Sequence, residues 1–160
     1  PDRVPAGRGA RHELQAADGA FLLIDESYNA NPASMRAALA VAGATPVGPN
    51  GRRIAVLGDM LELGPESARL HGDLAEAVVE NHIDIVLAAG TMMKNLHDAL
   101  PARAQGAWRS AAAELQPVVL DCIRAGDVVV VKGSNGSRMG SIVAAMKKAF
   151  DATAQMTEQA

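Results

Sequence analysis

Residues 21–42, FLLIDESYNANPASMRAALAVA, decide the fold of this 160-residue chain. Four apolar residues (21–24) come first and seven mostly polar ones (25–31) follow. Apolar residues then recur at Met35, Ala38, Leu39 and Ala42. A short apolar run is typical of a buried strand, and the spacing i, i+3, i+4, i+7 is typical of one helix face. Asn31 suits a helix N-cap and Pro32 the first helical position, so the stretch predicts strand, loop and helix in that order.

The same unit recurs along the chain. Apolar runs at 54–57, 83–88 (interrupted by Asp84) and 128–131 predict three more buried strands. Helical spacing follows or precedes them at Leu70, Leu74, Ala77 and Val78; at Met93, Leu96 and Leu100; at Leu115, Val118, Val119 and Cys122; and at Met139, Ile142, Val143, Met146 and Phe150. Strands that alternate with helices predict an α/β fold, a Rossmann-like, mostly parallel sheet with helices on both faces. Pro117 is expected to break or restart its helix.

The edges of the sheet can also be predicted. Asp18-Gly19 is a hairpin signal, so residues 12–16 should pair antiparallel with the first core strand as an edge strand. Residues 106–109 are a second candidate edge strand. One domain is expected over 1–150, and the aperiodic residues 151–160 are expected to be a loose C-terminal tail.

Composition narrows the function classes. The net charge of -3 and the 2% aromatic content give neither the basic face nor the stacking platforms of nucleic-acid binding. Cys122 is the only cysteine, so an intrachain disulfide is excluded and a reducing, cytoplasmic compartment is favoured. The apolar runs are too short to span a bilayer, so no membrane insertion is expected.

Every predicted strand ends in polar or small residues. These loops are 25–31, 58–60, 89–91 and 132–136. Ligands of open α/β sheets bind beyond the carboxyl ends of the strands, so the four loops predict a site along one rim. A carboxylate of the first loop can accept ribose hydroxyls, and Tyr28 can pack on a base. The last loop, rich in Gly and Ser with Lys132 and Arg138, suits an anion near a helix N-terminus.

Several motifs are absent from the sequence. It has no G-x-x-x-x-G-K-[ST] phosphate loop and no G-x-G-x-x-G dinucleotide loop. Its four histidines show no metal-ligand spacing, and no serine has a G-x-S-x-G context. Neither a metal site nor a catalytic nucleophile is therefore predicted in this chain.

The loops resemble a known family. Four segments resemble the C-terminal domain of the Mur ligases, in particular its D-Ala-D-Ala-adding members. They are residues 25–39; VLGDMLELG at 56–64, with His71 after it; VKGS at 131–134, followed by Met139; and Pro5-Ala6-Gly7-Arg8. The resemblance covers roughly residues 5–150. Glu26 stands where the family more often has Asp, and Gly140 where an acidic residue is common, so family contacts at position 140 are not transferred.

The resemblance implies a three-domain, ATP-dependent amide ligase of peptidoglycan synthesis, whose partners are ATP, D-Ala-D-Ala and UDP-N-acetylmuramoyl-tripeptide. It places the phosphate loop and the Mg ligands on another domain, so residues 1–160 alone are expected to be inactive. By position, the nucleotide side comprises Arg8, Glu26, Tyr28, Asn29 and Asn31. The side that binds the added dipeptide comprises Asp59, Gly90, Thr91, Lys132, Gly133, Ser134 and Asn135. Asp59 could serve either side, and Lys132 is expected to face the dipeptide carboxylate rather than a phosphate of ATP.

Two alternatives remain open at this point. The first is the C-terminal domain of another Mur-type ligase or of a folylpolyglutamate ligase, against which the string Ser27-Tyr28-Asn29-Ala30-Asn31 argues. The second is a non-enzymatic α/β binding module of the receiver type. Asp25, Glu26, Asp59 and Lys132 imitate the acidic pair, the phosphorylatable Asp and the late Lys of such a module, but residues 28–32 would have no role in it.

Overall fold

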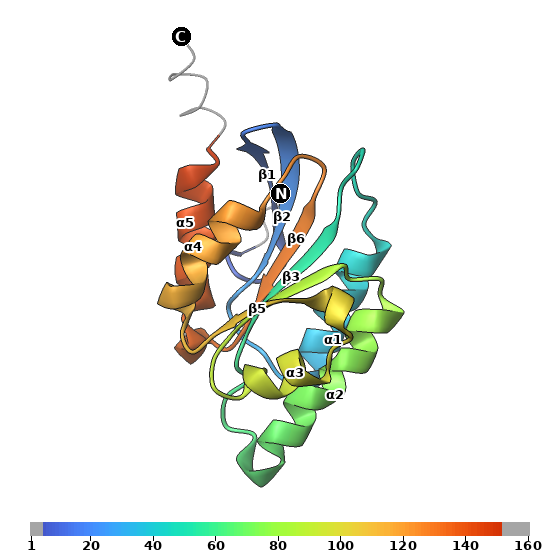
Figure 1. Ribbon diagram of the computed structural model, residues 1–160. Coiled ribbons are helices and arrows are strands. Elements are labelled where there is room, and N and C mark those ends of the chain that lie inside the picture. The colour runs from blue at the N-terminus through green and yellow to red at the C-terminus, as the bar shows by residue number, and fades with distance from the viewer. Residues whose placement is uncertain (1–4, 152–160) are drawn as a thin grey trace.

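The computed structural model describes residues 5–151, which form a six-stranded sheet with helices on both faces (Figure 1). The strands are β1 (Ala10–Ala16), β2 (Gly19–Glu26), β3 (Arg53–Gly58), β4 (Ile85–Ala89), β5 (Gln105–Arg109) and β6 (Val128–Lys132). The helices are α1 (Pro32–Ala44), α2 (Ser67–Glu80), α3 (Met93–Ala99), α4 (Ala112–Cys122) and α5 (Met139–Ala149). Short 3-10 turns lie at Gly64–Glu66, Ala102–Ala104 and Asn135–Ser137.

The sheet order is β1-β2-β6-β3-β4-β5, and all neighbours are parallel except β1 and β2. This confirms the predicted fold, including the antiparallel edge strand and the turn at Asp18-Gly19, where Ala16 pairs with Gly19. It also confirms the second edge strand, because β5 pairs with β4. The fourth core strand begins at Ile85 rather than at residue 83, since Asp84 instead exchanges hydrogen bonds with the Arg53 backbone.

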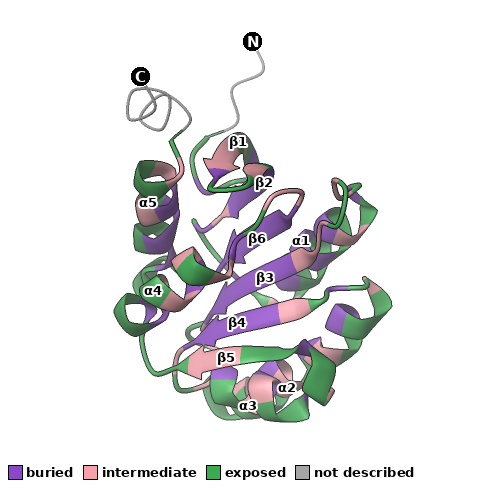
Figure 2. Ribbon diagram, turned by 45° about the horizontal axis from the view of Figure 1, so that its top comes forward, coloured by how far each residue is buried: buried purple, intermediate pink, exposed green. Residues whose placement is uncertain are grey.

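Two apolar layers hold the helices to the sheet. One layer packs α1, α2 and α3 on one face, through side chains such as Met35, Leu39 and Leu74. The other packs α4 and α5 on the opposite face, through Leu115, Val119 and Met139. Figure 2 shows that the buried positions concentrate in the central strands, whereas β5 at one edge is largely exposed. Within residues 5–151, no helix is both long and apolar enough to cross a membrane.

Helix α4 corrects one prediction, because it runs unbroken through Pro117. Pro117 is exposed, and so is Ala113, the residue whose carbonyl would otherwise accept a hydrogen bond from position 117. Leu115 and Val119, on either side of the proline, are both fully buried, and this packing holds the two halves of the helix in line. The predicted tail, 151–160, lies outside the described residues apart from Asp151, which is exposed.

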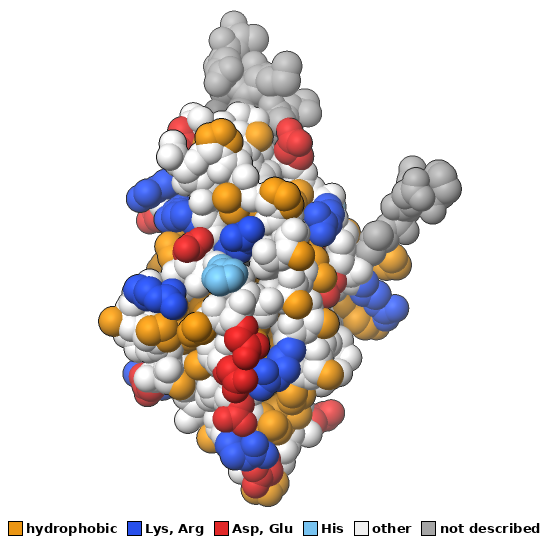
Figure 3. All heavy atoms as spheres, turned by 90° about the vertical axis from the view of Figure 1, so that its right-hand side faces the viewer, with side chains coloured by type: hydrophobic (Ala, Val, Ile, Leu, Met, Phe, Trp, Pro, Cys, Tyr) orange, Lys and Arg blue, Asp and Glu red, His pale blue; other side chains and the backbone are white. Residues whose placement is uncertain are grey.

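The surface formed by α1 and α2 carries charges of both signs (Figure 3). Arg69 of α2, for example, pairs with Glu66 and with Asp73. Acidic and basic side chains are interspersed on this face, so it presents no continuous basic field of the kind that nucleic-acid binding requires.

Sheet topology explains where a ligand can bind. The chain leaves β2 and β3 toward α1 and α2 on one face, but it leaves β6, which lies between these strands, toward α5 on the other face. The loops beyond the carboxyl end of β6 therefore diverge from those on both sides. Such a divergence opens a crevice in doubly wound sheets.

Candidate functional site

Two cavities flank the carboxyl end of β6. The first, between the ends of β2 and β6, has a volume of about 350 Å³ and is lined by Gly7, Arg8, Glu26, Tyr28, Asn29, Asn31, Ser34 and Lys132. All five residues predicted for the nucleotide side are in this set. We call it the β2–β6 cavity.

Arg8 and Tyr28 form one wall of the β2–β6 cavity. The guanidinium carbon of Arg8 lies 4.1 Å from the ring centroid of Tyr28, a cation–π distance. Tyr28 remains 49% exposed, so much of its ring is accessible to a ligand. Gly7 makes this approach possible, since its φ is +79° and a Cβ there would meet the Tyr28 backbone nitrogen at 2.8 Å.

The two adjacent carboxylates at the end of β2 have different environments. Asp25 is 2% exposed and accepts hydrogen bonds from the Gly7 amide (2.8 Å), the Ser27 amide (3.0 Å) and the Ser27 hydroxyl. These bonds tie residues 7 and 27 to the strand, so the role of Asp25 is structural. Glu26 instead lines the cavity, where its carboxylate is 3.9 Å from the Lys132 ammonium. Glu26 is thus the carboxylate available to a ligand.

Asn29 and Asn31 serve the loop as well as the cavity. The Asn31 side chain accepts from the Ser34 amide (2.8 Å) while the Ser34 hydroxyl accepts from the Asn31 amide, a reciprocal capping box that confirms the predicted N-cap. The Asn29 side-chain oxygen accepts from the Ala30 amide, and the Asn29 backbone carbonyl accepts from the Lys132 ammonium. These bonds fix the loop that carries Tyr28.

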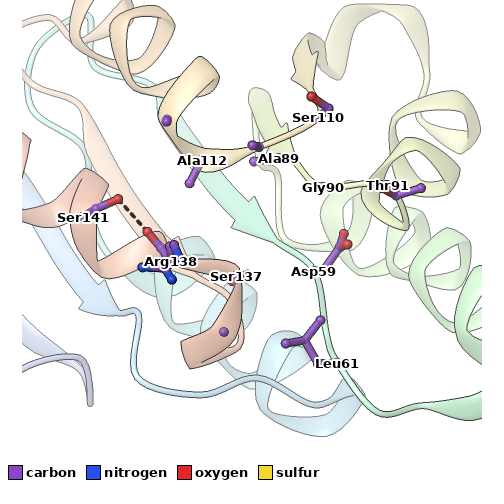
Figure 4. Close-up of a pocket in the computed structure, with 13 residues that line it drawn as sticks. Asp59, Leu61, Ala89, Gly90, Thr91, Ser110, Ala112, Ser137, Arg138 and Ser141 are labelled. Carbon is purple, nitrogen blue, oxygen red and sulfur yellow. Dashed lines mark hydrogen bonds between the residues drawn. The ribbon is translucent and has the colours of Figure 1, made fainter.

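The second cavity, on the other side of β6, has a volume of about 320 Å³ (Figure 4). We call it the β3–α5 cavity. Asp59, Leu61, Gly90 and Thr91 lie on one side of it, and Ser137, Arg138 and Ser141 on the α5 side. Ala89, Ser110, residues 111–113 and Gly136 complete its lining.

Three of the seven residues predicted for the dipeptide side, Asp59, Gly90 and Thr91, line the β3–α5 cavity. The other four lie elsewhere. Lys132 lines the β2–β6 cavity, and Asn135 lines a third, smaller cavity that also contains Asp25, Tyr28 and Lys147. Gly133 and Ser134 are buried and line neither main cavity.

Asp59 has a structural role that the sequence did not reveal. Its carboxylate accepts from the amides of Met92 (3.3 Å) and Met93 (2.9 Å) and so caps the start of α3. Gly90 lies against it with a φ of +118°, where any Cβ would overlap the carboxylate. Asp59 therefore fixes α3 and the floor of the cavity at once.

Ser134 connects the loops after β3 and β6. Its hydroxyl accepts from the Leu61 amide at 2.9 Å, and its own amide donates to the Asp59 carbonyl at 3.1 Å. His71, which is fully buried, accepts from the Met60 amide at 3.0 Å through Nε2, while its Nδ1 lies 2.6 Å from the Ser67 carbonyl. Hydrogen bonds from Ser134 and His71 therefore fix residues 59–61, which form one wall of the β3–α5 cavity.

Arg138 was expected only as a cation of an anion-binding loop and was assigned to neither side of the predicted site. It precedes α5 in the left-handed conformation, with φ of 61°, and lines the β3–α5 cavity. Its guanidinium has no ion-pair partner among residues 5–151. A free cation beside the N-terminus of an 11-residue helix favours an anionic ligand. The sequence shows that a cation is present at position 138, but it does not show which cavity that cation lines.

No group of three or more His, Cys, Asp or Glu side chains within residues 5–151 could hold a metal ion.

Comparison with known proteins identifies the family of this chain. The family model described as "Mur ligase, glutamate ligase domain" matches residues 10–135. UDP-N-acetylmuramoyl-tripeptide--D-alanyl-D-alanine ligase of Escherichia coli (strain K12) is 36% identical over 129 residues, which cover 79% of this chain and 27% of that protein. The enzyme of the same name from Rickettsia prowazekii (strain Madrid E) is 31% identical over 121 residues, covering 76% of this chain and 26% of that protein.

Solved structures have the same fold. MurF from Acinetobacter baumannii matches with a TM-score of 0.73 and 28% identity over 91% of this chain and 31% of its own. MurF ligase from Thermotoga maritima, in complex with ADP, matches with a TM-score of 0.72 over 91% of this chain and 31% of its own. At 23% identity, the second likeness concerns the fold alone. The chain thus spans between a quarter and a third of the length of these relatives.

Proposed function

The chain belongs to the Mur ligase family, and we propose that it is the C-terminal domain of the ATP-dependent ligase that adds D-Ala-D-Ala to UDP-N-acetylmuramoyl-tripeptide in peptidoglycan synthesis. The observation that carries this proposal is the similarity, over three quarters or more of the chain, to curated relatives of that name. The chain is much shorter than those relatives, so the complete reaction is proposed for the full-length protein.

The reaction has two steps. The terminal carboxylate of the tripeptide attacks the γ-phosphorus of ATP, which forms an acyl phosphate and releases ADP. The amine of D-Ala-D-Ala then attacks the acyl carbon, and inorganic phosphate leaves as the amide bond forms. A metal ion on the transferred phosphoryl group supplies charge stabilisation when bound. In this proposal its ligands belong to another part of the full-length protein.

The β2–β6 cavity is the proposed nucleotide side. Glu26 supports this role because its carboxylate can accept both ribose hydroxyls, as acidic residues do at the strand ends of nucleotide-binding folds. Tyr28, held by Arg8, offers a ring face to the base. Asn29 and Asn31 keep that loop in place.

The β3–α5 cavity is the proposed dipeptide side. Thr91 and Ser141 offer hydroxyls, and Arg138 offers a charge that complements the dipeptide carboxylate. The loops that form this cavity are fixed by hydrogen bonds of Asp59 and Ser134 and by close backbone approaches at Gly90 and Gly133. ATP and a UDP-linked substrate both point to a cytoplasmic location.

The test is a phosphate-release assay on the full-length protein that carries residues 1–160. Release should require ATP, UDP-N-acetylmuramoyl-tripeptide and D-Ala-D-Ala together, and the product mass should equal the sum of the two substrates minus water. Release with folate and glutamate in place of UDP-N-acetylmuramoyl-tripeptide and D-Ala-D-Ala would overturn the proposal. Residues 1–160 alone should not hydrolyse ATP, because one wall of the cleft lacks the phosphate and metal contacts.

A further inference from the structure

Lys132 is a buried cation that the proposed function does not yet explain. We propose that it is a positioning residue of the β2–β6 cavity: its ammonium holds the Asn29 carbonyl and faces Glu26, and so fixes the loop that presents Tyr28. This inference rests on the proposed function, since it uses the nucleotide role of that cavity. It reverses the expectation from sequence that Lys132 faces the dipeptide.

The direction of the side chain follows from its place in β6. Side chains alternate between the two faces of a strand, so Lys132 shares a face with Val128 and Val130. Both valines pack in the layer of α1, whereas Val129 and Val131 pack in the layer of α4 and α5. Lys132 therefore extends toward the loop before α1. Arg138 and Ser141, which line the other cavity, belong to the α5 side.

Register places Lys132 beside Glu26. The two residues are partners in the parallel pairing of β2 with β6, so their side chains leave the sheet together. The ammonium is 2.7 Å from the Asn29 carbonyl and 3.9 Å from the Glu26 carboxylate. A lysine that is only 4% exposed requires such partners, because unpaired burial of a charge is costly.

The contacts of Lys132 with Asn29 and Glu26 fix the position of the loop that carries Tyr28. The Asn29 carbonyl lies one residue beyond Tyr28, and Glu26 lies two residues before it. One ammonium thus contacts the loop on both sides of the exposed ring. An ammonium has three donors, and the bond to Asn29 uses one of them. Without the Lys132 ammonium, the loop and the Glu26 carboxylate would lose the contact that they share. Nucleotide binding should then weaken, while the β3–α5 cavity stays intact.

The experiment compares Lys132→Met, Lys132→Arg and the control Lys148→Met in the full-length ligase. Lys148 is an exposed lysine of the last turn of α5. We expect Lys132→Met to raise the KM for ATP by about tenfold, typical of a lost charge-assisted hydrogen bond, and to leave the KM for D-Ala-D-Ala within about threefold. Lys132→Arg should restore ATP binding only in part, because a planar guanidinium differs from a compact ammonium. Lys148→Met should change neither constant.

A double-mutant cycle with Glu26→Gln separates positioning from a general loss of structure. If Lys132 acts through Glu26, the two substitutions together should raise the KM for ATP by less than the product of their separate effects. A rise in the KM for D-Ala-D-Ala alone, or wild-type constants for both substrates, would overturn the inference. If Lys132→Met does not fold, Lys132→Arg is judged by the same split between the two KM values. Failure of the proposed function is distinct, because the wild-type protein would then show no release that depends on D-Ala-D-Ala.

Discussion

Nε2 of His71 accepts a hydrogen bond from the backbone amide of Met60, 3.0 Å away, beneath the loop that follows β3. An amide can only donate, so Nε2 carries no proton and Nδ1 donates to the Ser67 carbonyl at 2.6 Å. Both imidazole nitrogens are therefore satisfied in a side chain with no exposed surface. This histidine links the first turn of α2 to the wall of the β3–α5 cavity.

Replacing His71 by Ala should destabilise the domain by about 2–4 kcal/mol, because it leaves the buried Met60 amide without a partner and opens a cavity. His71→Gln should recover much of this loss, since its side-chain oxygen can accept from the same amide. The measurement is urea unfolding of residues 1–160. His97→Ala is the control, because Nδ1 of His97 has no hydrogen-bond partner among the described residues, and it should cost less than about 1 kcal/mol. Equal losses for His71→Ala and His97→Ala would contradict the prediction.

Glu26→Ala should raise the KM of the full-length ligase for ATP far more than that for D-Ala-D-Ala. The physical reason is the loss of a charge-assisted hydrogen bond to ribose, worth about 1.5–3 kcal/mol, or roughly ten- to a hundredfold. Glu76→Ala on the exposed face of α2 is the matched control and should change neither constant. A comparable rise for both substrates would indicate that Glu26 orders the whole cleft instead of binding the nucleotide.

Much of the fold could be predicted because each unit repeats one pattern. The apolar runs 21–24, 54–57 and 128–131 lie within β2, β3 and β6, and the hairpin followed from Asp18-Gly19. Pro117 was misjudged because a propensity says nothing about packing on either side of a residue. The packing of the buried Leu115 and Val119 on either side of Pro117 outweighs the missing bond.

The loops of the site could be predicted more readily than their internal arrangement. The family resemblance, rather than local sequence, placed Arg8 with Glu26 and Tyr28, and the three residues line one cavity. The faces of β6 could not be assigned to helices without knowing that α1 and α5 lie on opposite sides of the sheet, so the direction of Lys132 was not accessible. The separate roles of Asp25 and Glu26 depend on the Gly7 amide, 18 residues away from Asp25 in the chain. Long-range contacts of this kind leave no local signal.

Arg138→Gly should separate ligand binding from stability. Arg138 has φ of 61°, which is unfavourable for any residue with a Cβ, so glycine should keep or raise the stability of the domain by up to about 1 kcal/mol. The same change removes the only cationic side chain among the residues that line the β3–α5 cavity. The KM for D-Ala-D-Ala should therefore rise about tenfold or more, while that for ATP stays within about threefold.

Asn50→Gly is the matched control for Arg138→Gly. Asn50 has φ of 59° but precedes β3, at the opposite end of the sheet from the cavities. It should show a similar effect on unfolding and no effect on either KM. If Arg138→Gly leaves the KM for D-Ala-D-Ala unchanged, the dipeptide carboxylate is not bound at this arginine.

The pH dependence of stability should report on Lys132. Burial lowers the pKa of its ammonium below the ordinary value, and the nearby Glu26 carboxylate opposes this shift without cancelling it. In the unfolded chain the pKa returns to about 10.4. Between the two pKa values the unfolded state binds more protons than the folded state, so the free energy of unfolding rises with pH in this window. The gain is lost again as pH falls through the folded-state pKa.

The measurement is the free energy of unfolding of residues 1–160 and of Lys132→Met, from pH 7 to about pH 10.5. Subtracting the variant removes the contribution of groups that titrate in both proteins, such as Cys122, whose pKa is raised by burial. The difference, wild type minus variant, should increase as pH rises toward the unfolded-state pKa. Glu26→Gln removes the opposing charge, so in that background the pKa of Lys132 should fall further and the increase should be larger and begin at lower pH. A difference that instead decreases with rising pH would mean that the charge of Glu26 outweighs burial, because a raised pKa stabilises the fold only while the lysine stays protonated.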